Sequence, residues 1–155
     1  MNTKLTIRHV LKEKGNDMLW IAPHATAYEA LELMAEKNVG ALLVIENRML
    51  VGIFSERDYA RKVILYGKSS KTTTVRELMT STVITIDPGN TVSDCMEIMT
   101  ANHIRHIPVV EDGRLIGLVT LGDVVKAVIA SQQAMIRDLE NYISGGDYLQ
   151  QPIYF

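Results

Sequence analysis

The chain contains one sequence unit twice. Residues 20–64 align with residues 85–129 without a gap, at a constant offset of 65 residues. A unit present only twice favours two copies that dock on each other. Docked copies would share a cleft with approximate twofold symmetry, and such clefts are common ligand sites. The identical pairs include Ile21/Ile86, Pro23/Pro88, Thr26/Thr91, Met34/Met99, Val44/Val109, Glu46/Glu111, Leu50/Leu115, Gly52/Gly117 and Asp58/Asp123.

Each copy has the pattern of a β-α-β-β-α unit, which predicts an α/β fold. Thr26 and Thr91 are typical helix N-caps, and each follows a short strand and a proline turn. The next strand in each copy is apolar on both faces, which is typical of a buried strand. A turn of hairpin length then leads to a return strand and a second helix. The predicted strands are residues 18–21, 41–45 and 50–54 in the first copy, and residues 83–86, 107–110 and 115–119 in the second.

The order of these patterns predicts the domain boundaries. Related lead-in segments, residues 6–11 and 74–79, precede the two units, and a polar linker ends at Thr74. We predict one unit over residues 1–65, a second over residues 66–130, and a C-terminal helix and tail over residues 131–155.

Composition restricts the class of protein. Hydrophobic residues make up 47% of the chain, which is enough for a packed core, and the net charge of −2 argues against a nucleic-acid binder. The longest apolar run, residues 41–45, is far too short to span a membrane. The N-terminal residues do not resemble a signal peptide, and Cys95 has no second cysteine to pair with. We therefore expect a soluble cytoplasmic protein without a membrane or nucleic-acid partner.

Two matching motifs carry the candidate chemistry. Ser55 and Asp58 occupy the same positions in the first unit as Thr120 and Asp123 in the second, directly before a helix. A capping box would explain both pairs. Alternatively, each carboxylate accepts hydrogen bonds from a ribose diol while nearby helix N–H groups favour phosphate. The two roles are compatible.

The duplicated pattern Gly-hydrophobic-x-Ser/Thr-x-x-Asp, together with the stretch Ile-Arg-His-Ile-Pro-Val-Val at residues 104–110, resembles tandem CBS domains. Such a pair is called a Bateman module, and the resemblance to small stand-alone bacterial members covers about residues 5–130. The resemblance implies a pseudo-twofold, non-enzymatic regulatory module that binds AMP, ADP, ATP or NAD and needs no metal. It also implies a homodimer and an effector protein that the sequence does not identify.

The resemblance also implies which residues hold the ligand. The hydroxyl and the Asp of each motif would hold a ribose, and the backbone of the other unit would hold the adenine. One site would combine Thr120 and Asp123 with Thr6, Val39, Gly40 and Ala41. The other site would combine Ser55 and Asp58 with Thr74, Ile104, Arg105 and His106, and its phosphates would meet Arg57, Arg61, Arg105 and His106.

The two copies differ at the positions that matter most. Gly40 and Ala41 stand where the second unit has Arg105 and His106, and Gly122 stands where the first unit has Arg57. We therefore expect two different sites, one of which is empty or prefers another ligand.

Less specific interpretations compete at several of these residues. Arg57, Arg61 and Lys62 can equally form a solvated helix face. His103 and His106 have no further ligands nearby in sequence to complete a metal site. Cys95, Met34, Met96 and Met99 lie on the apolar faces of the predicted helices, which is typical of a core.

The sequence thus favours a nucleotide sensor in which the ligand bridges the two units and changes a surface seen by a partner. The alternative is a structural or protein-interaction module with a vestigial cleft, whose working part is the C-terminal helix. A nucleotide hydrolase is disfavoured, because no nucleophile or metal cage is evident in the sequence.

The C-terminal helix has a narrow apolar seam. Its members are spaced alternately by four and three residues, as in a coiled coil: Val125, Ile129, Gln132, Ile136, Leu139 and Ile143. Gly145 and Gly146 are expected to end the helix. We predict that this seam holds a homodimer together, and the alternative is that it folds back on its own module.

Overall fold

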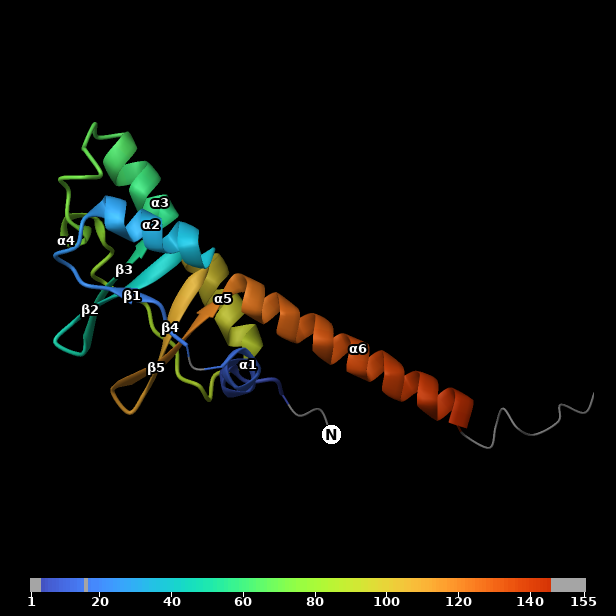
Figure 1. Cartoon of the computed structure of the whole chain (residues 1–155). Coiled ribbons are helices and arrows are strands. Elements are labelled where there is room, and N and C mark those ends of the chain that lie inside the picture. The colour runs from blue at the N-terminus through green and yellow to red at the C-terminus, as the bar shows by residue number, and fades with distance from the viewer. Residues whose placement is uncertain (1–3, 16, 146–155) are drawn as a thin grey trace, which may run out of the picture.

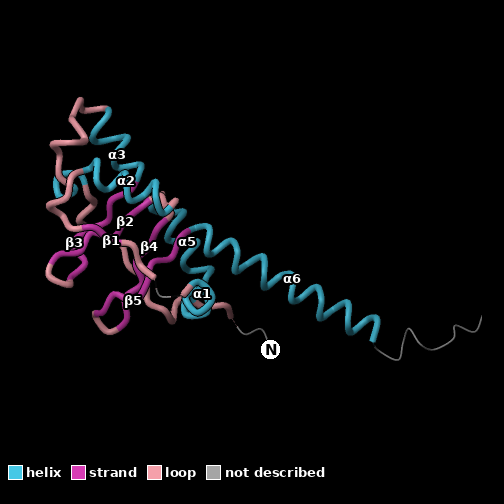
Figure 2. Tube along the Cα trace, in the orientation of Figure 1, coloured by secondary structure: helices cyan, strands magenta, loops and turns pink. Residues whose placement is uncertain are grey.

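The computed structural model describes residues 4–15 and 17–145. The first unit contains β1 (Trp20–Ile21), α2 (Ala27–Lys37), β2 (Ala41–Glu46), β3 (Met49–Ser55) and α3 (Glu56–Tyr59), which continues as the π-helical turn η1 (Ala60–Ile64). The second contains α5 (Val92–Asn102), β4 (His106–Glu111), β5 (Arg114–Thr120) and α6 (Leu121–Gly145). The lead-ins form α1 (Ile7–Lys14) and α4 (Val75–Leu78), as Figures 1 and 2 show.

Each unit is built on a small sheet. Strand β2 pairs with β1 in parallel and with β3 antiparallel, while β4 pairs antiparallel with β5. The predicted strand at residues 83–86 is wrong for most of its length, because only Ile86 bridges to Val109. The residues before Ile86 leave the sheet and line a cleft instead. The other predicted strands agree with the structure to within about two residues.

Both hairpins turn through residues with positive φ. Asn47 and Arg48 have φ of 50° and 65°, and Asp112 and Gly113 have φ of 50° and 77°. Two consecutive positive φ values are the signature of a type I′ turn, whose twist matches that of the flanking strands. The hairpins therefore bring the end of each return strand back to the start of each central strand, where Ser55 pairs with Ala41 and Thr120 with His106.

The predicted caps of the first helix in each unit are confirmed. Thr26 accepts a hydrogen bond from Glu29 N, and Thr91 accepts one from Asp94 N. These caps orient the buried faces of α2 and α5, where Met34, Cys95 and Met99 lie in the core as predicted. Burial raises the pKa of the Cys95 thiol to about 11. The prediction for Met96 is wrong, since that side chain is 41% exposed and borders two clefts.

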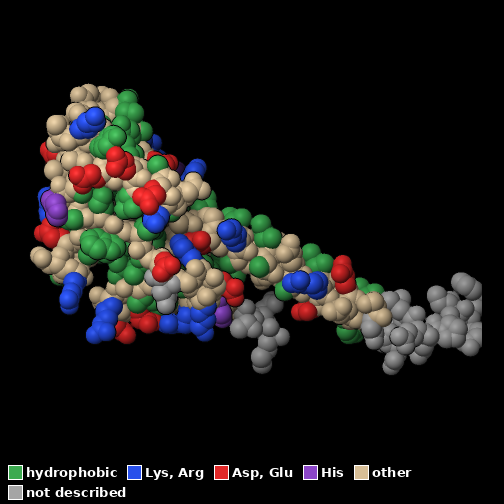
Figure 3. Space-filling model, viewed as in Figure 1, with side chains coloured by type: hydrophobic (Ala, Val, Ile, Leu, Met, Phe, Trp, Pro, Cys, Tyr) green, Lys and Arg blue, Asp and Glu red, His purple; other side chains and the backbone are tan. Residues whose placement is uncertain are grey.

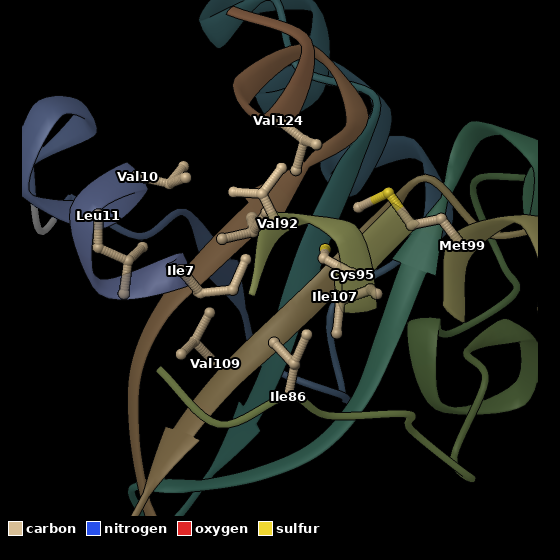
Figure 4. Close-up of a cluster of buried hydrophobic side chains, with 11 residues drawn as sticks. Ile7, Val10, Leu11, Ile86, Val92, Cys95, Met99, Ile107, Val109 and Val124 are labelled. Carbon is tan, nitrogen blue, oxygen red and sulfur yellow. The ribbon is translucent and has the colours of Figure 1, made fainter. Parts of the chain in front are cut away.

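The lead-in helices cross over between the units. Ile7, Val10 and Leu11 of α1 are buried in the core of the second unit, where they meet β4, β5 and α5 (Figure 4). Val75 and Leu78 of α4 are buried in the core of the first unit. Each core therefore contains residues from the other unit's lead-in, and the exchange ties the two units together.

A glycine in each return strand makes room for the exchanged lead-in. A Cβ added at Gly52 would lie 2.5 Å from the sulfur of Met79, and one at Gly117 would lie 2.7 Å from a methyl carbon of Leu11. Both distances are far below a van der Waals contact. The repeated Gly52/Gly117 pair is thus explained by packing of the lead-ins on β3 and β5.

Helix α6 leaves the module after its first turns. Val124 is fully buried, and Ala127 and Val128 pack against the second core, but every residue from Ile129 to Ser144 is exposed. Figure 1 shows the rest of the helix as an arm that projects from the module. The fold-back alternative is therefore wrong within the described helix. Predictions about the tail after Gly145 lie outside the described residues. No helix in the described part of the chain is both long and apolar enough to cross a membrane.

Candidate ligand-binding cleft

An open cleft lies between the two units on the side of Asp58. Its volume is about 1240 Å³, which exceeds the roughly 300–1,000 Å³ typical of small-molecule pockets and leaves room for a nucleotide. Most of the residues predicted for this site meet there. Seven of the eight residues predicted for it line the cleft: Ser55, Arg57, Asp58, Arg61, Ile104, Arg105 and His106. Gly40, which was predicted for the Asp123 site, also lies in this lining.

Asp58 is held in a fixed orientation in the lining of the cleft. Its Oδ2 accepts hydrogen bonds from Ser55 N at 3.0 Å and Ser55 Oγ at 3.1 Å, which completes the capping box at the start of α3. Its Oδ1 accepts a longer bond from Thr80 Oγ1 at 3.3 Å and lies 3.4 Å from Lys62 Nζ. The capping-box interpretation is therefore correct. The same bonds fix the orientation of the Asp58 carboxylate, which also borders the cleft.

The cleft is rich in cationic groups. Its lining includes Arg57, Arg61, Lys62 and Arg105, against the two carboxylates of Glu56 and Asp58. Arg57 donates to the backbone carbonyl of His103, a bond that joins the two units across the cleft. Cations in a concave site raise the local potential and favour anionic ligands such as phosphates.

The structure places Thr74 outside the lining of this cleft. Thr74 caps α4 through Glu77 and bridges to Thr26, so it serves the first unit's framework. After the short α4 the chain runs alongside β3, where Thr80 and Ile53 exchange backbone hydrogen bonds of 2.9 and 3.0 Å. The chain then enters the cleft, which Thr80, Thr82, Val83 and Ile84 line. The sequence analysis did not predict this segment as part of the site. The run of hydroxyl residues at Thr80, Ser81 and Thr82 could have indicated it, because hydroxyl groups are suited to bind a polar ligand.

The second motif has a different environment. Thr120 and Asp123 form the same reciprocal bonds as Ser55 and Asp58, but Lys14 Nζ donates to Asp123 Oδ2 and to Leu118 O, both at 2.7 Å. Burial alone would raise the pKa of Asp123, but the bonds from Lys14 and Thr120 outweigh it and hold that pKa below its usual value. Lys14 therefore forms a hydrogen-bonded ion pair with Asp123, whereas Lys62 lies at a longer 3.4 Å from the corresponding carboxylate of Asp58.

The difference arises from the lengths of the lead-in helices. Helix α4 ends at Leu78, and Met79 is extended, whereas α1 continues to Lys14 before Gly15 ends it with φ of 91°. The longer helix carries a lysine to the position of the second motif. The expected asymmetry between the two motifs is thus visible in the structure, in a residue that the sequence analysis did not select.

His106 lies where the central strands of the two units begin. A Cβ added at Gly40 would lie 3.7 Å from His106 Cε1, so the two strand entries face each other closely. Burial, and then the charge of Lys14, lower the pKa of His106. The lowered pKa favours the neutral imidazole, in which one ring nitrogen donates a hydrogen bond and the other accepts one.

The remaining predicted residues belong to the framework. Thr6 caps α1 through His9 and bridges to Thr91, in the same way that Thr74 bridges to Thr26. Val39 packs against the first core, and Ala41 is buried at the start of β2. These three were predicted for the Asp123 site, and none of them lies in the lining of the Asp58 cleft.

The comparisons with known proteins agree with this architecture. The family model for the CBS domain matches residues 6–64 and 75–130. The chain therefore belongs to the CBS-domain family, and the resemblance found in its sequence is confirmed. CBS domains generally bind adenosine-containing ligands, and tandem CBS domains are typically regulatory modules.

Three relatives show how far the similarity extends. The CBS domain-containing protein CBSX3, mitochondrial, of Arabidopsis thaliana is 44% identical over 91% of this chain and 73% of its own length. A solved structure of a protein with CBS domains from Burkholderia ambifaria MC40-6 has a TM-score of 0.79 and 45% identity, covering 82% of this chain and 96% of that one. An inosine-5'-monophosphate dehydrogenase of Korarchaeum cryptofilum is 38% identical, but the match spans 70% of this chain and only 22% of the enzyme.

The match to the dehydrogenase is confined to its CBS domains, so it does not make this chain an enzyme. Within residues 4–15 and 17–145, no three His, Cys, Asp or Glu side chains are grouped so that they could hold a metal ion.

Proposed function

We propose that the chain is a regulatory module that binds one adenine nucleotide in the Asp58 cleft. The observation that carries the proposal is the combination of a rigid carboxylate with four cationic side chains in one cleft between the units. A carboxylate suits a ribose diol, and guanidinium groups suit phosphates, so the cleft offers both parts of a nucleotide a partner.

The proposed roles follow from position. Asp58 and Thr80 accept and donate hydrogen bonds at the ribose, and the backbone of residues 82–84 and 104–106 flanks the adenine. Arg57, Arg61 and Arg105 bind the phosphates. Because these groups come from both units, the ligand would bridge them, and its binding would favour the arrangement of units in which all contacts form. An effector protein that recognises this arrangement would read the signal.

A direct experiment identifies the ligand. Protein purified without added nucleotide is denatured, and the released small molecules are identified by mass spectrometry. We expect AMP, ADP, ATP or NAD at up to one molecule per chain. If nothing is released and none of these four compounds binds at millimolar concentration, the proposal is wrong.

Asp58→Asn is expected to weaken nucleotide binding by about 1.5–3 kcal/mol, the contribution of a hydrogen bond to a charged group. Titration calorimetry measures this loss. The matched control is Asp94→Asn, because Asp94 fills the same capping-box position in α5 but is absent from the lining of the cleft. Both variants lose a similar cap, so equal nucleotide affinity in the two would refute the ribose role of Asp58.

We further propose that Lys14 closes the second motif to nucleotides. Its ammonium group already occupies Asp123 and the neighbouring carbonyl of Leu118, which are the acceptors a ribose would need. The ion pair is only partly exposed, with 29% and 19% of the two side chains accessible, so water screens it weakly.

Lys14→Met is expected to raise the binding stoichiometry from one nucleotide per chain to two, because it frees Asp123 while keeping the length of the side chain. Calorimetry gives the stoichiometry directly. Lys12→Met is the control, since Lys12 lies exposed one half-turn earlier on α1. A stoichiometry that stays at one in the Lys14 variant contradicts the proposed closure.

The alternative of an interaction module with a vestigial cleft is supported by one observation, the exposed apolar arm of α6. A homodimer and a protein partner are both compatible with nucleotide binding, so the arm does not decide between the functions. A cytoplasmic location remains our expectation from the sequence, while the name of the Arabidopsis thaliana relative places that protein in mitochondria.

A further inference from the structure

The projecting part of α6 presents an apolar seam that the described chain leaves uncovered. Five of its six members are apolar and between 43% and 58% exposed: Val125, Ile129, Ile136, Leu139 and Ile143. Figure 3 shows hydrophobic side chains recurring along the arm. Helices in proteins are stabilised mainly by packing of an apolar face, so we expect the arm to have a partner surface.

The two flanks of the seam differ in chemistry. In heptad terms, Ile129, Ile136 and Ile143 occupy a positions, and Val125, Gln132 and Leu139 occupy d positions. The g flank is apolar and consists of Val128, which also packs partly against the second core, and of Met135 and Tyr142. The e flank is polar and consists of Lys126, Gln133 and Glu140. The helix therefore has an apolar and a polar side next to its seam.

This asymmetry selects a direction of pairing with a second copy. In an antiparallel pair like flanks face each other, so the two apolar g flanks meet and Lys126 lies against the partner's Glu140. Twofold symmetry repeats this ion pair at the other end. In a parallel pair each g flank faces an e flank, which would set Met135 against the partner's Glu140. Charge and hydrophobic complementarity both favour the antiparallel arrangement.

We propose that residues 125–143 of α6 form an antiparallel helix pair with the same segment of a second copy of this chain. The register is centred on Ala134, so that Ile129 packs against the partner's Leu139 and Gln132 against the partner's Ile136. In this register all six seam residues have a counterpart. The proposal does not depend on the nucleotide site.

The antiparallel register also places the two modules at opposite ends of the pair. The partner's Tyr142 then lies opposite Val128, beside a groove lined by Lys4, Leu5, Met96, Val128 and Gln132. The arm of one copy would thus reach the surface of the other copy's second unit.

A distance measurement tests the direction. Spin labels attached through Ser144→Cys lie ten residues from Ala134 in each copy. With a rise of about 1.5 Å per residue, they would be roughly 30 Å apart in the antiparallel pair and less than about 20 Å apart in a parallel one. The native thiol of Cys95 is buried and does not compete for the label. A short distance, or no dimer at micromolar concentration, overturns the proposal.

Charge exchange tests the register. Lys126→Glu and Glu140→Lys each create two like-charge contacts and should weaken the dimer about tenfold in sedimentation experiments. An equimolar mixture of the two variants should form heterodimers of restored affinity, because every contact is then attractive. Arg137→Glu, which changes a charge away from the seam, serves as the control. If the single variants dimerise like the control, or if mixing restores nothing, the proposed pairing is wrong.

Discussion

Leu78→Ala should destabilise the chain by about 2–5 kcal/mol, the usual cost of emptying a fully buried leucine site. Leu78 belongs in sequence to the lead-in of the second unit, but it is buried completely in the core of the first. We therefore expect the loss to be local to the first unit, where amides of α2 and β2 would exchange faster with solvent. Denaturant unfolding and hydrogen exchange measure the two effects.

The matched control is Leu65→Ala, since Leu65 is 75% exposed and should cost almost nothing. Ile7→Ala is the mirror experiment, because Ile7 is buried in the core of the second unit. If Leu78→Ala loosened only α5 and β4, the crossing-over of the lead-ins would be wrong.

Saturation with the nucleotide should stabilise the chain by about 2.7 kcal/mol when its concentration is 100 times the dissociation constant. For a chain of 155 residues this corresponds to a rise in Tm of about 5–10 °C. The gain should fall to about 0.3–1.3 kcal/mol in Asp58→Asn at the same nucleotide concentration, because binding is weaker by about 1.5–3 kcal/mol. Calorimetric melting with AMP, ADP, ATP and NAD in turn measures it.

Two controls separate the parts of the ligand in this experiment. Adenosine tests the base and ribose alone, and inorganic phosphate tests the cationic groups alone. Arg105→Ala should reduce the shift with a nucleotide and leave the smaller shift with adenosine unchanged. An equal loss for both compounds would contradict a phosphate role for Arg105.

The repeated pattern was sufficient to predict the framework of each unit. Thr26, Thr91 and the apolar runs of the central strands are local signals, and caps and burial follow from them directly. These features depend on neighbouring residues and not on the arrangement of distant segments.

The errors occurred where distant segments meet. Most of the predicted strand at residues 83–86 is absent from the sheet, because these residues line the cleft. Met96 also lines the cleft and therefore lies outside the core. The contact of Lys14 with Asp123 was not predicted, because nothing in the local sequence shows that α1 lies beside Asp123. The lead-ins are alike in sequence but differ in helix length, and only the longer one places a lysine against the Asp of a motif.

The central claim is that an adenine nucleotide binds at Asp58 and not at Asp123. The most direct measurement is a titration of the ¹⁵N-labelled protein followed through its backbone amide shifts. We expect the largest shifts in residues 55–58, 80–84 and 104–106, with small changes at Lys14 and Asp123. Large shifts around Lys14 and Asp123 with none at residues 80–84, or no shifts with any of the four nucleotides, would contradict it.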